Sequence, residues 1–483
     1  MSRLIGAAKA DQIKAVHPKA CSREGCSGVT PVITAGSEPM QQHQGAALLR
    51  PEHAPVAVET LPVPTGTLPP VDAGETPLPG SLESGCIQGR LSHHNTHYRE
   101  GAVALDLGEG FFRPDSRPSR DLSVLLAAWT LQQRQGRACR WLDLMAGCGI
   151  RALRWGVEAL SAGGHPDTAV DLTVNDADED RQPLLLRNLQ PLRSGPLSLR
   201  CLHQPAEVLL RRAYLDRHHF DLIDLDAFGC PNGLLQATLE VLAWNGVLLL
   251  ASTDGRSPTG HDRSAAVRRF GAAARVHPAS WELALRLQLA ALAREAWLLG
   301  RGLQPLACFS DGRTFRLAVR VTKRAAAKEE QQLGFLARCD ACGDQAVQTL
   351  LRLQGWRACA CGAGRGRWAV SGPLWLGPLQ APAVIAELVS LAGSLPETLS
   401  SEGRRLLQRL EDDPGVPSTC WSTAELAHRL QLPGPPPIRA LVADLQAAGF
   451  HAGCSGVMAG QLRTDAPLDS LLQICRHQGQ KDR

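Results

Sequence analysis

The sequence predicts an α/β fold, in which a mostly parallel sheet is layered with helices, followed by a small cysteine-rich module and a C-terminal α+β domain. From about residue 89 to residue 330, apolar strand-like runs alternate with amphipathic helical stretches, which is typical of β-α-β units. Residues 331–380 are rich in cysteine, glycine and arginine, and residues 381–483 have a helical pattern. A chain of 483 residues is long enough for about three such folded units.

The N-terminal residues 1–88 differ from the rest of the chain in composition. The segment Pro51–Gly80 contains eight prolines and has neither helical nor strand periodicity. This composition is typical of polyproline-like or disordered segments, so we expect no folded core in this tail.

Composition excludes several classes of protein. The formal net charge of +4 is too small for a histone-like or polybasic protein, and 44% of the residues are hydrophobic. Fifteen unevenly spaced cysteines in so long a chain do not form a small disulfide scaffold. Neither a secretory signal nor a transmembrane segment is apparent. We therefore expect a cytoplasmic protein that does not enter a membrane, and no obligatory protein partner is apparent.

Four apolar runs in the first domain predict strands of the sheet, and helices lie between or after them. The predicted strands are Trp141–Met145, Asp171–Val174, Phe220–Asp224 and Gly246–Leu250. The predicted helices are Leu234–Leu242 and Trp281–Leu299. An Asp-Gly pair then favours a hairpin turn between two further strands, Leu306–Phe309 and Thr314–Val321.

The C-terminal domain contains two predicted helices, Ser422–Leu430 and Ile438–Ala448, on either side of the proline-rich turn Pro433–Pro437. Their size and their short connection are typical of a helix-turn-helix or winged-helix unit.

The first predicted strand runs into a glycine turn of the kind that binds nucleotides. Asp143 lies in this strand, and Gly147 and Gly149 follow, where glycine lets the backbone approach a ligand closely. No third glycine follows at the spacing of the dinucleotide fingerprint. Asp176, just after the second strand, can accept hydrogen bonds from both ribose hydroxyls. S-adenosylmethionine therefore fits better than NAD, and the alternative is that Asp176 only caps the next helix.

The segment Asp224–Pro231 places two carboxylates, an aromatic ring and a glycine after another strand. It resembles the Asp/Asn-Pro-Pro-aromatic motif of amino-group methyltransferases, and ligands bind at this edge of open α/β sheets. An exocyclic amine on a base is a weak nucleophile because the ring delocalises its lone pair. Asp226 could accept an N–H of such an amine and then its proton, while Phe228 stacks on a flipped-out base. Helix capping and turn formation are the alternative roles of Asp224 and Asp226.

Several segments, in this order, resemble the Trm1 family of tRNA (guanine-N2)-dimethyltransferases. The resemblance runs from about residue 99 to residue 467 and includes Phe111–Leu122, Leu142–Arg151, Asn175-Asp176, Ile223–Pro231, Ser252–Gly255, Gly372–Leu379 and Arg463–Pro467. It implies a class I, Rossmann-like methyltransferase domain that transfers two methyl groups in succession from S-adenosylmethionine to the N2 atom of one tRNA guanine, usually at position 26.

The resemblance also implies roles for individual residues. Arg120 and Asp176 would hold the cofactor, and Asp226 would activate guanine N2. The cofactor pocket would be lined by Phe111, Asp143, Ala146, Gly147, Asp226 and Phe228, and Asp224 and Phe228 are further catalytic candidates beside Asp226. The chain departs from the family pattern at Ala227, where the motif has proline, and at Pro258–Gly260 and Gly453–Gly456, the last of which lacks a basic pair.

Four cysteines have the spacing of a metal site. Cys339 and Cys342 are separated by two residues, and Cys359 and Cys361 by one. Four thiols in this arrangement suit a structural tetrahedral Zn²⁺ site. The alternative is a redox dithiol, but the first pair does not open a helix in a β-α-β unit.

Basic residues are concentrated beside the predicted active site. Residues 261–330 contain 13 Lys and Arg against six Asp and Glu, and we expect Arg263, Arg313 and Arg316 to contact RNA phosphates. A solvated helix face is the alternative for any single arginine. Two other functions stay open: an N6-adenine nucleic-acid methyltransferase, and a non-catalytic nucleic-acid-binding regulator with a zinc module and a winged helix.

Overall fold

The computed structural model describes residues 97–163, 168–312, 314–359, 361–362 and 366–481. The predicted N-terminal tail, residues 1–88, lies outside the described residues. None of the helices in the described ranges combines the length and apolar character needed to cross a membrane.

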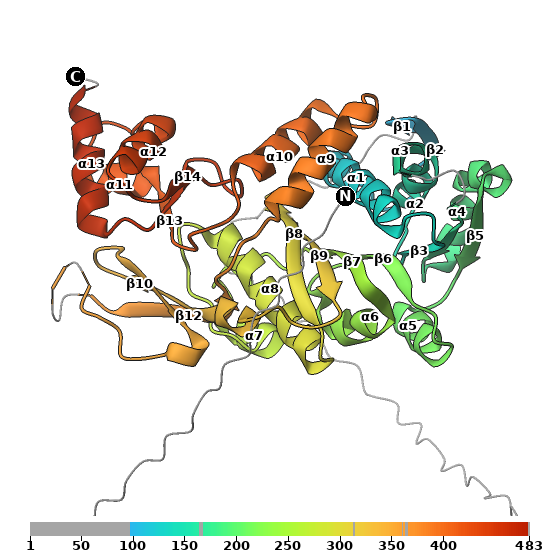
Figure 1. Cartoon of the computed structure of the whole chain (residues 1–483), viewed down its shortest axis with the longest axis horizontal. Helices are drawn as coiled ribbons and strands as arrows, with labels where there is room; N and C mark the ends of the chain where they lie inside the picture. Colours follow the sequence, from blue (N-terminus) through green and yellow to red (C-terminus); the bar gives the residue numbers. More distant parts are fainter. Residues whose placement is uncertain (1–96, 164–167, 313, 360, 363–365, 482–483) are drawn as a thin grey trace, which may run out of the picture. The chain divides into compact units, whose positions relative to one another are not determined.

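The main domain is built on a seven-stranded sheet with the order β5-β4-β3-β6-β7-β9-β8 (Figure 1). The strands β3 to β7 pair in parallel, whereas β9 runs antiparallel to both β7 and β8. The predicted α/β class is therefore confirmed, and the mostly parallel sheet fits a class I methyltransferase. The strands are β3 (Cys139–Asp143), β4 (Val170–Asn175), β5 (Leu197–Leu202), β6 (Phe220–Asp226), β7 (Leu242–Ser252), β8 (Gly302–Ser310) and β9 (Phe315–Thr322).

Each face of this sheet is buried under helices, because alternate strand residues point to opposite faces. On β6, Leu222 belongs to one buried cluster and Ile223 to the other. The first cluster includes residues of α1 (Arg117–Arg134), α2 (Ile150–Arg154) and α4 (Gln182–Asn188). The second includes residues of α5 (Ala206–Leu215), α6 (Leu235–Val241), α7 (Arg263–Phe270) and α8 (Ser280–Leu298). The predicted helices that correspond to α6 and α8 are thus confirmed.

Smaller elements complete this domain. A hairpin of β1 (His97–Glu100) and β2 (Val103–Asp106) precedes α1, and α3 (Leu160–Gly163) ends the helical segment that begins with α2. The predicted hairpin near residue 311 is present as the antiparallel pair β8–β9.

The cysteine-rich module is an antiparallel three-stranded sheet with the order β11-β10-β12. Its strands are β10 (Leu333–Cys339), β11 (Gln345–Thr349) and β12 (Trp368–Trp375). Cys339 is the last residue of β10, so the first cysteine pair lies at the end of a strand and no helix follows it.

The C-terminal segment divides into two parts. The helices α9 (Pro382–Ser394) and α10 (Ser401–Asp412) pack beside α1 and share its buried cluster (Figure 1). The remainder is an α+β unit in which both predicted helices are present. It consists of β13 (Cys420–Ser422), α11 (Thr423–Leu430), α12 (Ile438–Ala447), β14 (Ala452–Cys454), β15 (Gln461–Thr464) and α13 (Leu468–Lys481).

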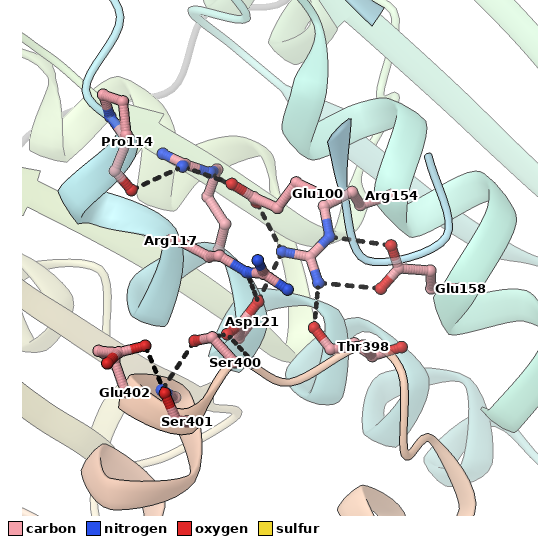
Figure 2. Close-up of polar contacts among 12 residues, drawn as sticks. Glu100, Pro114, Arg117, Asp121, Arg154, Glu158, Thr398, Ser400, Ser401 and Glu402 are labelled. Atoms are coloured by element: carbon pink, nitrogen blue, oxygen red, sulfur yellow. Dashed lines mark hydrogen bonds and ion pairs between the residues drawn. The ribbon is translucent and has the colours of Figure 1, made fainter. Parts of the chain in front are cut away.

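A buried ion-pair cluster joins the N-terminal hairpin, α1, α2 and the loop before α10 (Figure 2). At its centre, all five N–H groups of Arg154 have acceptors, namely the carboxylates of Glu100, Asp121 and Glu158 and the carbonyl oxygen of Thr398. Arg154, Glu100 and Asp121 have no exposed surface. A charge this deeply buried is tolerated because every donor is matched.

A second buried cluster joins α8 to the C-terminal unit. Arg463 on β15 donates to both carboxylate oxygens of Asp413, at 2.7 and 3.0 Å, and also pairs with Glu282 of α8. Glu282 in turn accepts from Arg286, at 2.8 Å. The Arg463–Pro467 segment singled out in the sequence therefore has a packing role.

Candidate active site

The predicted site residues meet at the carboxyl edge of the parallel strands, around a cavity of about 540 Å³. This volume is typical of small-ligand sites, and the position is where open α/β sheets bind ligands. The predicted residues that line the cavity are Phe111, Arg120, Asp143, Ala146, Gly147, Asp176, Asp224, Asp226, Phe228 and Arg316. The structure thus brings together ten of the residues selected from the sequence.

The glycine turn after β3 forms one wall of the cavity. Gly147 has a φ of +57°, and a Cβ atom at this position would meet no other atom within 4 Å. The turn is tied to the next strand, because the Gly147 N–H donates to Asp176 Oδ2 at 2.7 Å. Asp176 Oδ1 accepts from the backbone of Asp178, and it is Asp178 that caps the following helical turn. Asp176 therefore supports the turn and faces the cavity instead of capping the helix.

Three carboxylates lie beside this turn, and one arginine from α2 binds two of them. Arg151 Nε lies 2.7 Å from Asp224 Oδ2, and Arg151 Nη2 lies 3.1 Å from Asp226 Oδ2. Asp143 is buried and accepts from the backbone N–H of Ala152. Arg151 was not assigned a role from the sequence, although it directly follows the glycine turn.

The three carboxyl groups have different pKa values. Burial, together with the charge of Asp224, raises the pKa of Asp143 well above its usual range. Burial also raises the pKa of Asp224 to about 6, against the opposing effect of Arg151. Burial would raise the pKa of Asp226 too, but the Arg316 and Arg151 guanidiniums outweigh it and lower that pKa. Asp226 is therefore ionised at neutral pH, as a group that takes up a proton must be.

Two exposed phenylalanines flank the mouth of the cavity. Phe111 is 63% exposed and Phe228 is 77% exposed, and their rings pair edge-to-face with centroids 5.4 Å apart. The guanidinium of Arg113 lies 5.0 Å from the centroid of Phe111. Exposed aromatic rings beside a cation can stack on a nucleic-acid base.

The loop that carries Phe228 is held by hydrogen bonds to the end of β7. Gly229 has a φ of +76°, its N–H donates to Thr253 Oγ1 at 2.7 Å, and its carbonyl accepts from Thr253 N at 2.9 Å. The hydroxyl of Ser252 donates to the same carbonyl. Ala227 stands where the family motif has proline, so these bonds supply the restraint. Thr253 lies in Ser252–Gly255, one of the segments that resemble the family, and the sequence pattern alone does not indicate its contact with Gly229.

Replacing Thr253 with Val should loosen this loop without changing the size of the side chain. One hydrogen bond is worth about 0.5–1.5 kcal/mol, so we expect kcat/KM for the reaction at this site to fall by up to about tenfold. Steady-state kinetics would measure this. Thr322→Val, which removes a hydroxyl bonded to Arg324 O on an exposed segment, is the matched control. Equal activity of the two variants would mean that the loop does not depend on Thr253.

Arg120 has mainly internal partners. Its guanidinium forms a two-pronged ion pair with Glu100, at 2.8 and 2.6 Å, and donates to the carbonyl oxygens of Arg113 and Pro114. Only one Nη1 hydrogen has no acceptor among the described residues. Arg120 thus supports the segment that carries Phe111, and its predicted contact with the cofactor can use this one hydrogen.

The three arginines predicted to contact RNA differ in position. Arg263 begins α7 and is exposed. Arg313 lies outside the described residues. Arg316 is only 11% exposed and lies 2.9 Å from Asp226 Oδ2, so it is part of the site and not of the outer surface. Counting charges along the sequence could not distinguish these positions.

The four cysteines of the module come together. The Sγ atoms of Cys339, Cys342, Cys359 and Cys361 all lie within 4.8 Å of one another. The Sγ atoms of Cys339 and Cys361 are 3.8 Å apart, which equals the edge of about 3.8 Å expected for four sulfurs placed 2.3 Å from a tetrahedral zinc. A Cβ atom on Gly366 would collide with Cys339 Sγ, so a glycine there leaves room for the cluster. The four-thiol donor set suits a zinc ion, whereas the Sγ atoms of Cys359 and Cys361, 2.9 Å apart, lie closer together than that tetrahedral edge.

The fold and the cavity define a class I methyltransferase type of domain, with a nucleotide-type loop and an acidic centre at one sheet edge. The chain belongs to the family described as N2,N2-dimethylguanosine tRNA methyltransferase, whose model matches residues 96–476. The family resemblance inferred from the sequence is thereby confirmed.

Individual relatives agree with this assignment. The tRNA (guanine(26)-N(2))-dimethyltransferase of Methanocorpusculum labreanum is 28% identical over 74% of this chain and 87% of its own. The protein of the same name from Archaeoglobus fulgidus is 25% identical over 78% and 97%. Trm1 from Pyrococcus horikoshii, solved with S-adenosyl-L-methionine, has a TM-score of 0.64 at 21% identity, covering 78% of this chain and 99% of that one. This last similarity concerns the fold.

Proposed function

We propose that this protein transfers one and then a second methyl group from S-adenosylmethionine to the exocyclic N2 atom of a tRNA guanine, at position 26. Family membership supports the reaction class, and the names of the curated relatives support the position. The observation that carries the proposal is Asp226, an ionised carboxylate beside an exposed Phe228 at the mouth of the cavity.

The cavity is suited to S-adenosylmethionine. The open space above Gly147 allows close approach of a ligand to the backbone. Each carboxylate oxygen of Asp176 accepts one backbone N–H and keeps a lone pair for a ribose hydroxyl. When bound, S-adenosylmethionine supplies a methyl group on a positively charged sulfur, which leaves as a neutral thioether.

The residues of the chain would position and deprotonate the guanine. Phe228 would stack on the flipped-out base, and the carboxylate of Asp226 would accept a hydrogen bond from the N2 amine. As N2 gains a methyl group through its lone pair, one N2 hydrogen leaves as a proton and Asp226 takes it. A methylated, positively charged amine is a strong acid, so a carboxylate with a lowered pKa is a sufficient acceptor. The product retains one hydrogen on N2, which allows the second transfer.

The test is methylation of an unmodified tRNA transcript with labelled S-adenosylmethionine, followed by nucleoside mass spectrometry. We expect N2,N2-dimethylguanosine in the transcript with guanine 26 and none when adenine replaces it. Formation of N6-methyladenosine would contradict the proposal and support the adenine methyltransferase alternative. If the protein binds tRNA but neither methylates it nor binds S-adenosylmethionine, that result would support the non-catalytic regulator.

Binding of tRNA is proposed to involve the exposed Arg263 and the C-terminal unit. The helices α11 and α12, followed by the antiparallel pair β14–β15, have the order of a winged-helix-like unit. Arg263 at the start of α7 has no ion-pair partner within the described ranges and is free to contact a phosphate.

We also propose a structural Zn²⁺ bound by Cys339, Cys342, Cys359 and Cys361. Metal analysis of the purified protein should find about one zinc ion per chain, because four thiolates complete a closed tetrahedral site. Cys342→Ser should lower this content strongly, whereas Cys201→Ser, a half-buried cysteine outside the cluster, should not. Protein without zinc and with four titratable thiols in the module would rule out the site.

A further inference from the structure

Two arginines bind the same oxygen of Asp226. Arg316 Nη1 lies 2.9 Å and Arg151 Nη2 lies 3.1 Å from Oδ2. No described residue donates a hydrogen bond to Oδ1, although the carboxylate lines the cavity and its side chain is 30% exposed. The two carboxylate oxygens are therefore in different situations, one bound by the protein and one accessible from the cavity.

We propose that Arg316 and Arg151 anchor Oδ2 of Asp226 so that Oδ1 faces the N2 amine, which makes Arg316 a positioning residue for methyl transfer. This inference rests on the proposed function. The side-chain torsion χ2 of aspartate has a broad distribution. A carboxylate whose two oxygens both lack a hydrogen-bond donor therefore rotates through a wide range of angles. Donors from two separate elements, β9 and α2, fix the plane of this one.

The groups around Asp226 come from each neighbouring element. Asp143 of β3 and Asp224 on its own strand are carboxylates, Arg151 lies on α2, and Arg316 lies on β9 opposite Ala251 of β7. The two arginines are not equivalent. Arg151 also neutralises the buried Asp224, whereas Arg316 pairs with no second carboxylate among the described residues. Replacing Arg316 therefore removes one anchor of Asp226 without leaving Asp224 unpaired.

The position of Arg316 makes it a poor phosphate contact. Its side chain is 11% exposed, and its Nε is buried without a hydrogen-bond partner within the described part of the chain. A surface arginine that binds RNA would change affinity and the salt dependence of binding when removed. An arginine that orients Asp226 would change the rate of the chemical step, so the two roles predict different kinetics.

The experiment is single-turnover methylation of tRNA at saturating S-adenosylmethionine by wild-type protein, Arg316→Met and Arg316→Lys. Arg316→Met retains the apolar stem but removes both charge and donor. We expect its rate to fall by about tenfold to a hundredfold, with little change in tRNA affinity, because small misplacements of a reacting group have effects of this size. Arg320→Met is the matched control, since Arg320 lies on the same strand but packs over Trp129.

The pH profile separates positioning from a structural role. Loss of Arg316 removes a cation that lowers the pKa of Asp226, so the acidic limb of the rate should move to higher pH. Arg316→Lys keeps the charge and should move the limb less than Arg316→Met does. If Arg316→Met lowers the melting temperature but leaves the acidic limb of the pH–rate profile in place, the inference is overturned. It is also overturned if Arg316→Met weakens tRNA binding but leaves the methylation rate unchanged. Inactive wild-type protein would instead refute the proposed function.

Discussion

Replacing Asp226 with Asn is expected to slow methyl transfer by roughly 10²–10⁴-fold while cofactor binding is retained. The amide has nearly the same shape as the carboxylate, but it cannot take a proton from the N2 amine. It also lacks the charge that Arg316 and Arg151 bind. Single-turnover methylation of tRNA measures the rate, and calorimetry measures binding of S-adenosylmethionine.

The control for this change is Asp216→Asn, which alters an exposed aspartate after α5 that is not part of the cavity. It should leave both the rate and cofactor binding as in the wild type. Normal formation of dimethylguanosine by Asp226→Asn would show that Asp226 is not the proton acceptor. A variant that has lost cofactor binding would instead indicate that Asp226 shapes the pocket.

Replacing Arg154 with Met is expected to lower the free energy of unfolding by about 3–5 kcal/mol. The change leaves Glu100, Asp121 and Glu158 buried without the cation that they share (Figure 2). It also removes the hydrogen bond to the Thr398 carbonyl, which joins the methyltransferase core to the loop before α10. Chemical denaturation monitored by circular dichroism would measure the loss.

The loss in Arg154→Met should depend on pH. In the wild type, burial would raise the pKa of Glu100, but Arg120 and Arg154 outweigh it and hold that pKa below its usual value. The stability that Glu100 contributes is therefore present above the pKa that Glu100 has in the unfolded chain. It is lost as the pH falls through the pKa that Glu100 has in the folded protein. Without Arg154, the folded pKa of Glu100 rises, so protonation of Glu100 at low pH relieves part of the penalty. The difference between variant and wild type should consequently shrink from pH 8 to pH 5.

Arg405→Met is the matched control, because the Arg405–Glu402 pair lies on the exposed surface of α10. Exposed pairs contribute little, so this variant should unfold like the wild type. If Arg154→Met does not yield folded protein, Glu158→Gln removes one charge from the same cluster and should give a smaller loss. Arg154→Met and Arg405→Met could instead lower the free energy of unfolding by the same amount at every pH. That result would contradict the importance of the buried cluster.

Local features of the chain predicted the elements that build the site. Alternating apolar runs and glycine turns indicated the strands and the cofactor loop, because such patterns depend on residues close in sequence. The predicted strands, the two predicted helices that correspond to α6 and α8, and the hairpin near residue 311 are all present. The edge strand β5 was missed, since the half-exposed pattern of Leu197–Leu202 gives a weak apolar signal.

The partners of Asp226, the proposed proton acceptor, could not be predicted in the same way. Arg151 and Arg316 lie 75 and 90 residues from Asp226 in the sequence, and only the insertion of β9 beside β7 brings Arg316 to the site. Its charge was assigned to RNA binding because the segment around it is basic. Pairing with Asp226 changes that assignment, and the prediction for Arg316 now concerns positioning.

The sequence by itself determined the α/β class, the family, the glycine turn, the carboxylate–aromatic motif and the four cysteines of the proposed zinc site. These features are encoded locally, by spacing and residue type within short segments. Only the tertiary structure decided which charges are paired: Arg316 with Asp226, Arg154 with three carboxylates, and Arg463 with Asp413 and Glu282. Whether an arginine binds a partner or remains free depends on burial and on distant neighbours, which neither composition nor spacing contains.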